Sequence, residues 1–479
     1  MNPVRRCSAL LHRDFTSLCL SSLGSAQKTT ETPKRVPSPS SRHCHQLSGG
    51  EVLTCQPQVK PSGASSVSVN TRIAGPMGSG SSRSRLFGTL AQTLSSPSIP
   101  LELPALEAAE CACEPADPDL LLRECEEALR NRPARWRRRF MRPHTQAQAH
   151  LDQQPIRVMQ WNILAQALGE GKDGFVRCPP EALNWAERKY LILEEILTYQ
   201  PDILCLQEVD HYYDTFQPVL ASLGYQGSFC PKPWSPCLDV VNNNGPDGCA
   251  LFFRRDRFEM LSTSHLRLSA MMLKTNQVAV VSTLRCRETG RRFCVAVTHL
   301  KARSGWESLR SAQGRSLLQS LGNITMETDP RDAVARGGEA DRRRVGNGLV
   351  VQEEGVADEA GVPLIVCGDF NAEPWEDVYK RFASSPLGLD SAYKRLSADG
   401  RTEPPYTSWK IRRSSGESCH TLDYIWYSHR RFQVDAVLEL PGEEQIGPDR
   451  LPSYHYPSDH LSLVCDFSFS EPPQTHRLL

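Results

Sequence analysis

The segment LIVCGDFNAEP, residues 364–374, places an acid and an amide directly after four apolar residues. Asp369 and Asn371 are two positions apart. Because successive side chains of a β-strand point to opposite faces, we expect these two groups to point toward one site at the carboxyl end of a buried strand. A carboxylate can orient or deprotonate a water molecule, and an amide can donate to a phosphoryl oxygen. The pair therefore indicates a hydrolytic site.

Five further apolar runs are interrupted or followed by polar side chains: MQWNIL, LCLQEVD, AVTHLKAR, CHTLDYIWY and YPSDHLSLV. One at a time, each has an ordinary structural explanation, such as a helix cap for Glu208, a turn for Asp369 or a hydrogen-bonded core position for His460. Their recurrence favours one shared site, because a buried polar group costs free energy unless it is paired or used. The polar residues of these runs are Asn162, Glu208, His299, Lys301, Arg303, His420, Asp423, Asp459 and His460.

These residue types suit the metal-assisted hydrolysis of a phosphoester. Glu208 offers the hard oxygen ligands that Mg²⁺ prefers, and Asp459 beside His460 supplies an acid–imidazole pair. Lysine and arginine side chains neutralise phosphate charge. The chain has no GxxxxGK[ST] loop and no GxGxxG motif after a strand, so a P-loop or a Rossmann cofactor site has no support.

The composition is that of a soluble globular protein with a large core and tails. Of 479 residues, 39% are hydrophobic and 23% charged, and the formal net charge is zero. The lack of a basic excess argues against a long nucleic-acid footprint. No apolar run approaches the roughly 20 residues that a membrane helix needs. The 17 cysteines form no CxxC pair, which indicates reduced packing thiols in an intracellular protein and no zinc site.

The elements that must position these residues begin at Ile156. From there, apolar runs typical of strands alternate with helical patterns, which predicts one α/β domain over residues 151–470 with two packed sheets. Residues 326–361 interrupt the pattern. They are polar and aperiodic, so we expect a disordered insertion there, followed after the domain by a tail at 471–479.

The N-terminal third is expected to lie outside this domain. Residues 1–50 are rich in arginine and serine and poor in acids, which is typical of a mitochondrial transit segment, although a plain disordered tail has the same composition. Residues 51–150 are predicted to be a mostly disordered linker. Within the linker we expect a short acidic helix at 117–131 and an arginine-rich run at 130–143, either solvated or forming a basic surface for a partner.

A second start of translation would change the location of the product. The sequence MGSGSS at Met77 fits the myristoylation pattern if translation begins there, although a chance match is the better interpretation in a Ser/Gly-rich segment. We expect the full chain in mitochondria. The shorter form is expected in the cytoplasm, with at most weak membrane contact.

Asn162, Glu208, THL, GDFN and SDH, in this order, resemble the endonuclease/exonuclease/phosphatase superfamily over about residues 156–470. The resemblance implies a four-layer sandwich, two mixed β-sheets flanked by helices, with Mg²⁺ at one end. Longer stretches, MQWNILAQALGEGKDGF, PKPWSPCLDVVNNNGPDGCALFF, THLKARSGWE and EQIGPDRLPS, are similar to a group within the superfamily. That group removes the 2′-phosphate from NADP⁺ and NADPH, giving NAD⁺ and NADH, and is linked to metabolic and circadian regulation.

The resemblance also implies roles for matching residues. Glu208 would hold Mg²⁺, with Asn162 and Asp423 in the wider shell. The implied catalytic residues are Asp369, Asn371, His460, Asp459, His299 and Asn162. Asp369 would position or activate the attacking water. His460, oriented by Asp459, would bind or protonate a phosphoryl oxygen, and His299 would contact phosphate or act as the leaving-group acid.

The implied substrate contacts surround this group. Lys232, Lys301 and Arg303 would clamp the phosphates of the dinucleotide and Trp234 would pack against it, whereas Asn276 is equally well explained by a turn. The full set is Glu208, Lys232, Pro233, Trp234, Asn276, His299, Leu300, Lys301, Ala302, Arg303, Asp369, Phe370, Asn371, His420 and His460.

Two rival functions remain open from the sequence. Carbon-catabolite-repressor-type deadenylases resemble the same domain and share its metal site, so a 3′-exoribonuclease acting on poly(A) is the nearest alternative. RNA is the less favoured substrate, because the cations we can place lie near the site and form no obvious track along the domain. A non-catalytic interaction protein is the other alternative, and the intact set of site residues argues against it. We expect a monomer.

Overall fold

The computed structural model describes residues 115–143, 154–326 and 361–470. The predicted transit segment, the possible start at Met77, linker residues 51–114 and 144–150, the insertion at 327–360 and the tail at 471–479 lie outside the described residues. Among the helices that are described, none has the length and apolar character needed to cross a membrane. The described cysteines are free thiols and most are buried, as the scattered spacing predicts.

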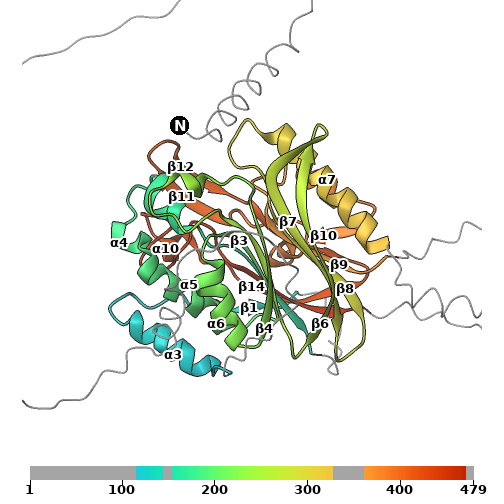
Figure 1. Ribbon diagram of the computed structural model, residues 1–479, viewed down its shortest axis with the longest axis horizontal. Coiled ribbons are helices and arrows are strands. Elements are labelled where there is room, and N and C mark those ends of the chain that lie inside the picture. The colour runs from blue at the N-terminus through green and yellow to red at the C-terminus, as the bar shows by residue number, and fades with distance from the viewer. Residues whose placement is uncertain (1–114, 144–153, 327–360, 471–479) are drawn as a thin grey trace, which may run out of the picture. The chain divides into compact units, whose positions relative to one another are not determined.

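Two large mixed β-sheets form the centre of the domain (Figure 1). Each sheet has one parallel pair, β2–β3 in the first and β8–β9 in the second, and antiparallel neighbours elsewhere. In spatial order the seven-stranded sheet contains β1 (Phe140–Met141), β14 (Phe432–Leu438), β15 (Leu463–Phe469), β2 (Ile156–Asn162), β3 (Ile203–Val209), β5 (Gly248–Arg254) and β4 (Tyr225–Pro231). The six-stranded sheet contains β10 (Leu389–Ser391), β13 (Asp423–Ser428), β9 (Leu364–Asp369), β8 (Arg292–His299), β7 (Leu273–Cys286) and β6 (Phe258–Ala270).

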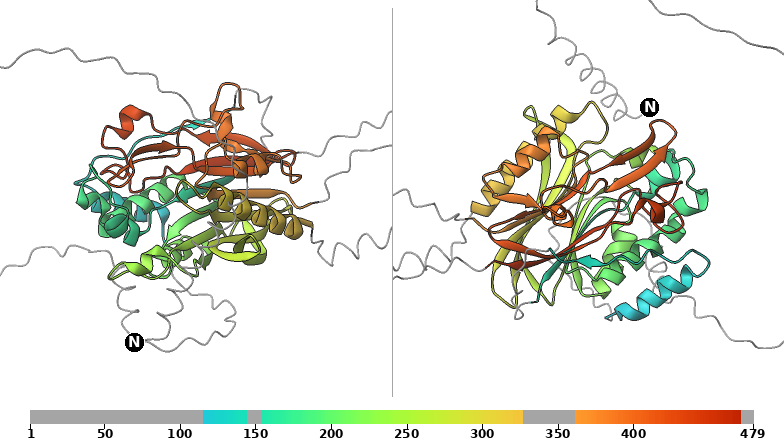
Figure 2. Two further views of the ribbon diagram at one scale, coloured as in Figure 1. Left: turned by 90° about the horizontal axis from the view of Figure 1, so that it is seen from above. Right: turned by 180° about the vertical axis from the view of Figure 1, so that it is seen from behind.

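Helices cover the outer face of each sheet (Figure 2). The longer ones on the seven-stranded sheet are α3 (Pro118–Ala128), α5 (Trp185–Tyr199) and α6 (Gln217–Ser222), and those on the six-stranded sheet are α7 (Glu307–Met326) and α9 (Asp377–Ala383). Short turns of helix are α4 (Pro180–Leu183), α10 (Glu443–Ile446), η1 (Leu168–Lys172), η2 (Tyr212–Phe216), η3 (Pro236–Asp239) and η4 (Ala392–Leu396). A separate hairpin pairs β11 (Ser408–Arg412) with β12 (Gly416–His420).

Three apolar layers hold these elements together. Along β2, Val158 packs between the two sheets, whereas its neighbour Met159 packs outward beneath α5 with Ile192. The outer face of the second sheet packs against α7 and α9 in the same manner, through residues such as Leu317 and Phe382. Strands buried on both faces read as continuous apolar runs, which is the pattern that the sequence shows. The predicted four-layer sandwich is confirmed.

The arginine-rich run is part of the folded domain, which corrects the prediction of a linker there. Helix α3 packs Leu121 and Cys125 against α5 and α6, and β1 extends the first sheet by pairing with β14. The side chain of Arg138 is only 2% exposed. It forms an ion pair with Glu195 and donates hydrogen bonds to the Ser462 hydroxyl and to the Ser462 carbonyl at 3.0 Å. A charge run does not reveal such partners, because they lie far away in the sequence.

Arg138→Ala should lower the free energy of unfolding by about 3 kcal/mol, because it leaves the buried carboxylate of Glu195 without its main partner. Arg135, 3.7 Å from the other Glu195 oxygen, keeps the loss at the low end of the usual range. The matched control is Arg139→Ala: this side chain is 85% exposed and its ion pair contributes less than about 1 kcal/mol. Urea denaturation measures both variants, and equal losses would contradict the buried clamp.

Candidate active site

Both parallel pairs end at the same place. β2 ends at Asn162 beside the segment of β3 that carries Glu208, and β8 ends at His299 in register with Asp369 of β9. The Asn162 Nδ2 group donates to Glu208 Oε1 and to Asp369 Oδ2, each at 3.0 Å. One buried amide therefore joins a carboxylate of the first sheet to a carboxylate of the second.

The backbone is strained around this amide. Glu208 has a φ of 57° and follows a bulge in the β3–β5 ladder, and Leu164 and Asn371 have φ values of 60° and 50°. Left-handed backbone costs a non-glycine residue roughly 1–2 kcal/mol, and such residues concentrate at functional sites. The strain therefore marks this edge of the sheets as a site.

Asn371 reaches the site through a turn, which corrects the prediction that it shares a strand face with Asp369. β9 ends at Asp369. The Asn371 N–H donates to Asp369 Oδ1 at 2.8 Å, and its side-chain amide donates to the Leu300 carbonyl at 3.1 Å. Aspartate and asparagine favour this local turn geometry, which the strand pattern alone does not distinguish.

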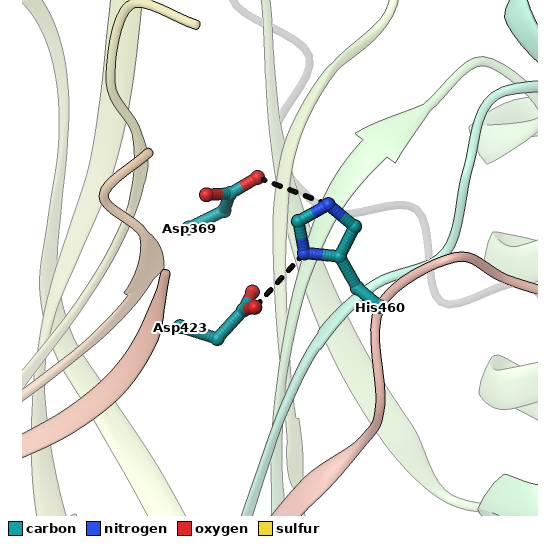
Figure 3. Close-up of side chains that lie close together, drawn as sticks. All are labelled: Asp369, Asp423 and His460. Carbon is teal, nitrogen blue, oxygen red and sulfur yellow. Dashed lines mark hydrogen bonds and ion pairs between the residues drawn. The ribbon is translucent and has the colours of Figure 1, made fainter. Parts of the chain in front are cut away.

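His460 is oriented by Asp423, not by the adjacent Asp459 (Figure 3). Asp423 Oδ2 lies 2.9 Å from His460 Nδ1, whereas His460 Nε2 lies 3.8 Å from both Asp369 and Asp459. Burial disfavours the charged imidazole, but the carboxylates of Asp423, Asp369 and Asp459, with Asp423 the strongest, together outweigh it and raise the pKa of His460 to about 9. The ring is therefore an imidazolium at neutral pH, with its Nε2 edge toward Asp369.

Asp459 instead holds two cations that our sequence reasoning missed. Its Oδ2 atom accepts from Lys410 Nζ at 2.5 Å and from Arg412 Nη2 at 3.2 Å. These cations hold the pKa of Asp459 well below its ordinary value in spite of burial. The alternation KIR along a short strand places both cations on one face and was the available signal.

Burial and neighbouring charges shift the pKa values of three further groups, Asp369, His299 and Lys232. Burial raises the pKa of Asp369 to about 6, against the opposing effect of His460. Burial and the nearby Lys232 lower the pKa of His299 well below the ordinary value, so this ring is neutral and poorly suited to be a leaving-group acid. Lys232 remains charged because Asp247, 2.5 Å away, raises its pKa against the effect of burial.

The carboxylates fit a divalent metal better than the amide does. Asp369, Asp423 and His460 lie close enough to share an ion. However, Asp423 already accepts from Gln160 at 3.1 Å and Thr407 at 2.7 Å as well as facing the imidazolium. The carboxylates of Glu208 and Asp369 meet at one NH₂ group and keep free lone pairs, the hard oxygen donors that suit Mg²⁺.

The place of Asn162 and Asp423 in the wider shell of a metal stays a prediction, and the hydrogen bonds of both residues position other side chains of the site. The side-chain oxygen Oδ1 of Asn162 accepts the Leu164 N–H at 3.1 Å, which turns the NH₂ group of the same side chain toward the carboxylates. Asn162 positions Glu208 and Asp369, and Asp423 positions His460. The two roles follow from hydrogen bonds between different strands, which sequence spacing does not show.

Most of the predicted substrate contacts outside the catalytic cluster form a rim of exposed or half-buried residues. Pro233, Trp234 and Arg303 are exposed on loops, His420 is exposed at the end of β12, and Asn276, Lys301 and Ala302 are half-buried. Asn276 shares a face of β7 with Val278, which packs between the sheets. Lys301 Nζ lies 5.5 Å from the centre of the Trp306 ring.

The side chains of Leu300 and Phe370 lie outside this rim, so the substrate contacts predicted for these residues stay predictions that concern their backbone atoms. Both side chains are buried in the apolar layer beneath α7 and α9. Only their backbone serves the site: the Leu300 N–H donates to the Asp369 carbonyl at 2.9 Å, and the Phe370 N–H donates to the Leu422 carbonyl at 2.8 Å. Their positions within the THL and GDFN motifs led to the prediction of a substrate contact, whereas the side chains of both residues face the core.

A buried arginine connects two segments of the site. Arg188 of α5 donates to the carbonyls of Ile163 and Pro457, each at 2.7 Å, and to that of Leu164 at 2.5 Å. It thereby ties the end of β2 to the loop that carries His460. Sequence patterning gave no sign of this role, since Arg188 reads as a polar residue on a surface helix.

The site can now be compared with known proteins. Residues 159–460 match the Endonuclease/Exonuclease/phosphatase family. Nocturnin of Rattus norvegicus is 54% identical over 473 residues, covering 98% of both chains. The solved human nocturnin catalytic domain, with a bound sulfate anion, shares 57% identity and a TM-score of 0.53, and covers 71% of this chain and 99% of that one. More distantly, carbon catabolite repressor protein 4 homolog 1 of Arabidopsis thaliana is 28% identical, covering 65% of this chain and 57% of that one.

Asp423→Asn should lower the pKa of His460 in metal-free protein from about 9 toward the ordinary value of 6.5, because it removes the carboxylate that stabilises the imidazolium. Since the folded-state pKa lies above that of an unfolded histidine, this pairing stabilises the fold below pH 6.5, and the stabilisation is lost as the pH rises through about 9. NMR of the histidine ring hydrogens measures the pKa. Asp459→Asn is the comparison, and a larger drop there would reverse the assignment.

Proposed function

This chain belongs to the endonuclease/exonuclease/phosphatase family and, within it, to the nocturnins, and on that basis we propose that it is a Mg²⁺-dependent phosphatase that removes the 2′-phosphate from NADP⁺ and NADPH. Family membership makes the chain a hydrolase of phosphoric esters. Members of this family generally depend on divalent metals, and the buried acid–histidine cluster is consistent with such an ion. The choice of NADP(H) comes from the likeness to nocturnins.

The observation that carries the proposal is the Asn162 bridge with His460 facing it. Two carboxylates lie on either side of one NH₂ group, and an imidazolium lies 3.8 Å from the nearer of them. Hydrolysis of a phosphomonoester needs a site for a metal, an acceptor for the proton of water and a cation for the phosphoryl oxygens. All three occur here within one buried cluster.

The described residues divide the reaction between them. The oxygen of water forms a bond to phosphorus while the bond from phosphorus to the 2′-oxygen breaks, and the departing 2′-oxygen takes a proton from solvent water to become the 2′-hydroxyl. Asp369, with a pKa of about 6, accepts the proton of the attacking water, and the His460 Nε2–H donates to a phosphoryl oxygen. Mg²⁺ held at Glu208, with Asp369 beside it, would stabilise the negative charge that develops on the phosphoryl group.

Charges around the cluster suit a substrate with several phosphates. Lys232 is held in its charged form beside His299, and Lys301 and Arg303 lie on the loop that follows β8. The human relative is described with a sulfate anion, which has the shape and charge of phosphate. A compact group of cations fits a dinucleotide that carries three phosphoryl groups.

A poly(A)-specific 3′-exoribonuclease is the second candidate. It is favoured by the more distant likeness to a carbon catabolite repressor protein 4 homolog. Two observations favour the dinucleotide: the chain has no net positive charge, and several arginines of the arginine-rich run, including Arg132 and Arg138, are paired within the fold. A non-catalytic interaction protein has no need of the strained, hydrogen-bonded cluster.

Purified protein with Mg²⁺ should release phosphate from NADPH and leave NADH, and should shorten an oligoadenylate far more slowly. Phosphate release, NADH formation and a sizing gel, run side by side on both substrates, measure the outcome. EDTA should abolish phosphate release, and added Mg²⁺ should restore it. Rapid shortening of the oligoadenylate without phosphate release from NADPH would establish the exoribonuclease instead.

Glu208→Ala should lower kcat for NADPH about a hundredfold or more, because it removes the principal carboxylate for the metal. Glu444→Gln is the control, since Glu444 is an exposed acid on α10 away from the cluster. A thermal melt checks that both variants are folded. Retention of most activity by Glu208→Ala at limiting Mg²⁺ would show that the metal is held elsewhere.

A further inference from the structure

We propose that Lys410 is a further catalytic residue, whose ammonium group binds a phosphoryl oxygen of the substrate together with the Nε2 edge of His460. The inference rests on the proposed function and adds a residue that the sequence did not indicate. The ligand class it implies is a phosphomonoester dianion or its product, inorganic phosphate.

The β11–β12 hairpin delivers Lys410 to the site. In Figure 1 this hairpin lies at the upper left, apart from the two large sheets. The loop that carries His460 runs beside β11: the Trp409 N–H donates to the Asp459 carbonyl at 3.3 Å, and the Leu461 N–H donates to the Thr407 carbonyl at 2.8 Å. Ser408 of β11 forms a β-bridge with His460, and Lys410, two residues further on, shares the face of Ser408 and contacts Asp459 and His460.

The hydrogen bonds of Lys410 are incomplete. The residue is only 9% exposed, and an ammonium group has three N–H donors that need acceptors. One donates to Asp459 Oδ2 at 2.5 Å, and another faces His460 Nε2 at 3.3 Å. Within residues 115–143, 154–326 and 361–470, no further side-chain partner of Lys410 is present. A buried donor without an acceptor costs free energy, which a ligand oxygen would recover.

The Nε2 edge of His460 is the second group of the proposed phosphoryl site. Because Nδ1 is committed to Asp423, the ring is fixed and Nε2 is the edge left for a ligand. Asp369 and Asp459 both lie 3.8 Å from Nε2, beyond a hydrogen bond, and Lys410 is its nearest neighbour. The two nitrogens lie 3.3 Å apart, so one anionic oxygen placed against the pair accepts from Lys410 Nζ and lies at the Nε2 edge of His460.

A phosphoryl oxygen is the acceptor that the reaction brings to this position. Asp369, which receives the proton of the attacking water, lies 3.8 Å from the same Nε2 atom. The negative charge on the phosphoryl group rises in the transition state, so a fixed ammonium group contributes more to the transition state than to the ground state. The contribution of Lys410 should therefore appear in kcat more than in KM.

The competing explanation is that Lys410 only neutralises Asp459. This explanation predicts that Lys410→Met is harmful because the buried charge of Asp459 loses its nearer cation and keeps only Arg412, at 3.2 Å. Replacing both residues removes that charge, so the double variant Lys410→Met with Asp459→Asn separates the two explanations. Asp459→Asn alone is the reference for the double variant.

We expect Lys410→Met to lower kcat for NADPH roughly a hundredfold with KM changed less than about threefold, in line with the loss of one donor to a developing oxyanion. The double variant should stay as slow as Lys410→Met. Recovery of the double variant to the kcat of Asp459→Asn would overturn the proposal. If Lys410→Met does not fold, Lys410→Arg takes its place. This variant keeps the charge beside Asp459, so a low kcat would come from the lost ammonium contact and not from the charge of Asp459. Loss of activity that follows only a lower melting temperature would also overturn it.

Binding of inorganic phosphate to the Mg²⁺-loaded protein gives a readout that does not depend on the substrate. Isothermal titration should show binding weakened roughly tenfold in Lys410→Met, the usual loss for a charge-assisted contact. Lys380→Met, which removes an exposed lysine on α9, should bind phosphate like the wild type. If phosphate binding depends on Lys410 but NADPH is not hydrolysed, only the proposed function fails. If NADPH is hydrolysed and neither readout depends on Lys410, only this inference fails.

Discussion

The side-chain amide of Asn162 links the two β-sheets of this domain at the candidate active site. The NH₂ of Asn162 donates to Glu208 on its own sheet and to Asp369 on the other, both at 3.0 Å. Two carboxylates brought this close repel each other unless donors or a cation lie between them. The amide, its own oxygen fixed by the backbone of Leu164, keeps them facing the same space. The rest of the site is arranged around that pair.

The surrounding structure supports this arrangement by holding the neighbouring side chains in place through hydrogen bonds. Asp423 stabilises the His460 imidazolium and is itself held by Gln160 and Thr407. Arg188 ties the loop of His460 to the strand of Asn162 through three carbonyl groups. These contacts offset the strain of left-handed backbone at Glu208 and its neighbours.

Cations in this protein serve different purposes according to their burial. Arg138 is enclosed by the fold and clamps the N-terminal strand, so its charge contributes to stability. Lys232 and Lys410 are buried beside the catalytic cluster, where one carboxylate fixes each ammonium group and leaves donors facing the site. Arg303 is exposed on a loop and is free to meet a substrate. Burial, which sequence position does not reveal, separates these classes.

The sequence by itself determined the family, the four-layer sandwich and the set of polar residues that meet at one edge. It could do so because apolar runs of strand length report sheets buried on both faces, and because the carboxyl ends of parallel strands share an edge. Only the tertiary structure decided which groups pair. His460 is bound by Asp423, 37 residues away, and not by its neighbour Asp459, while Lys410 and Arg138 found their partners across the fold. Hydrogen bonds form between atoms that are close in space, and adjacency in the chain places side chains on opposite faces as often as on the same one.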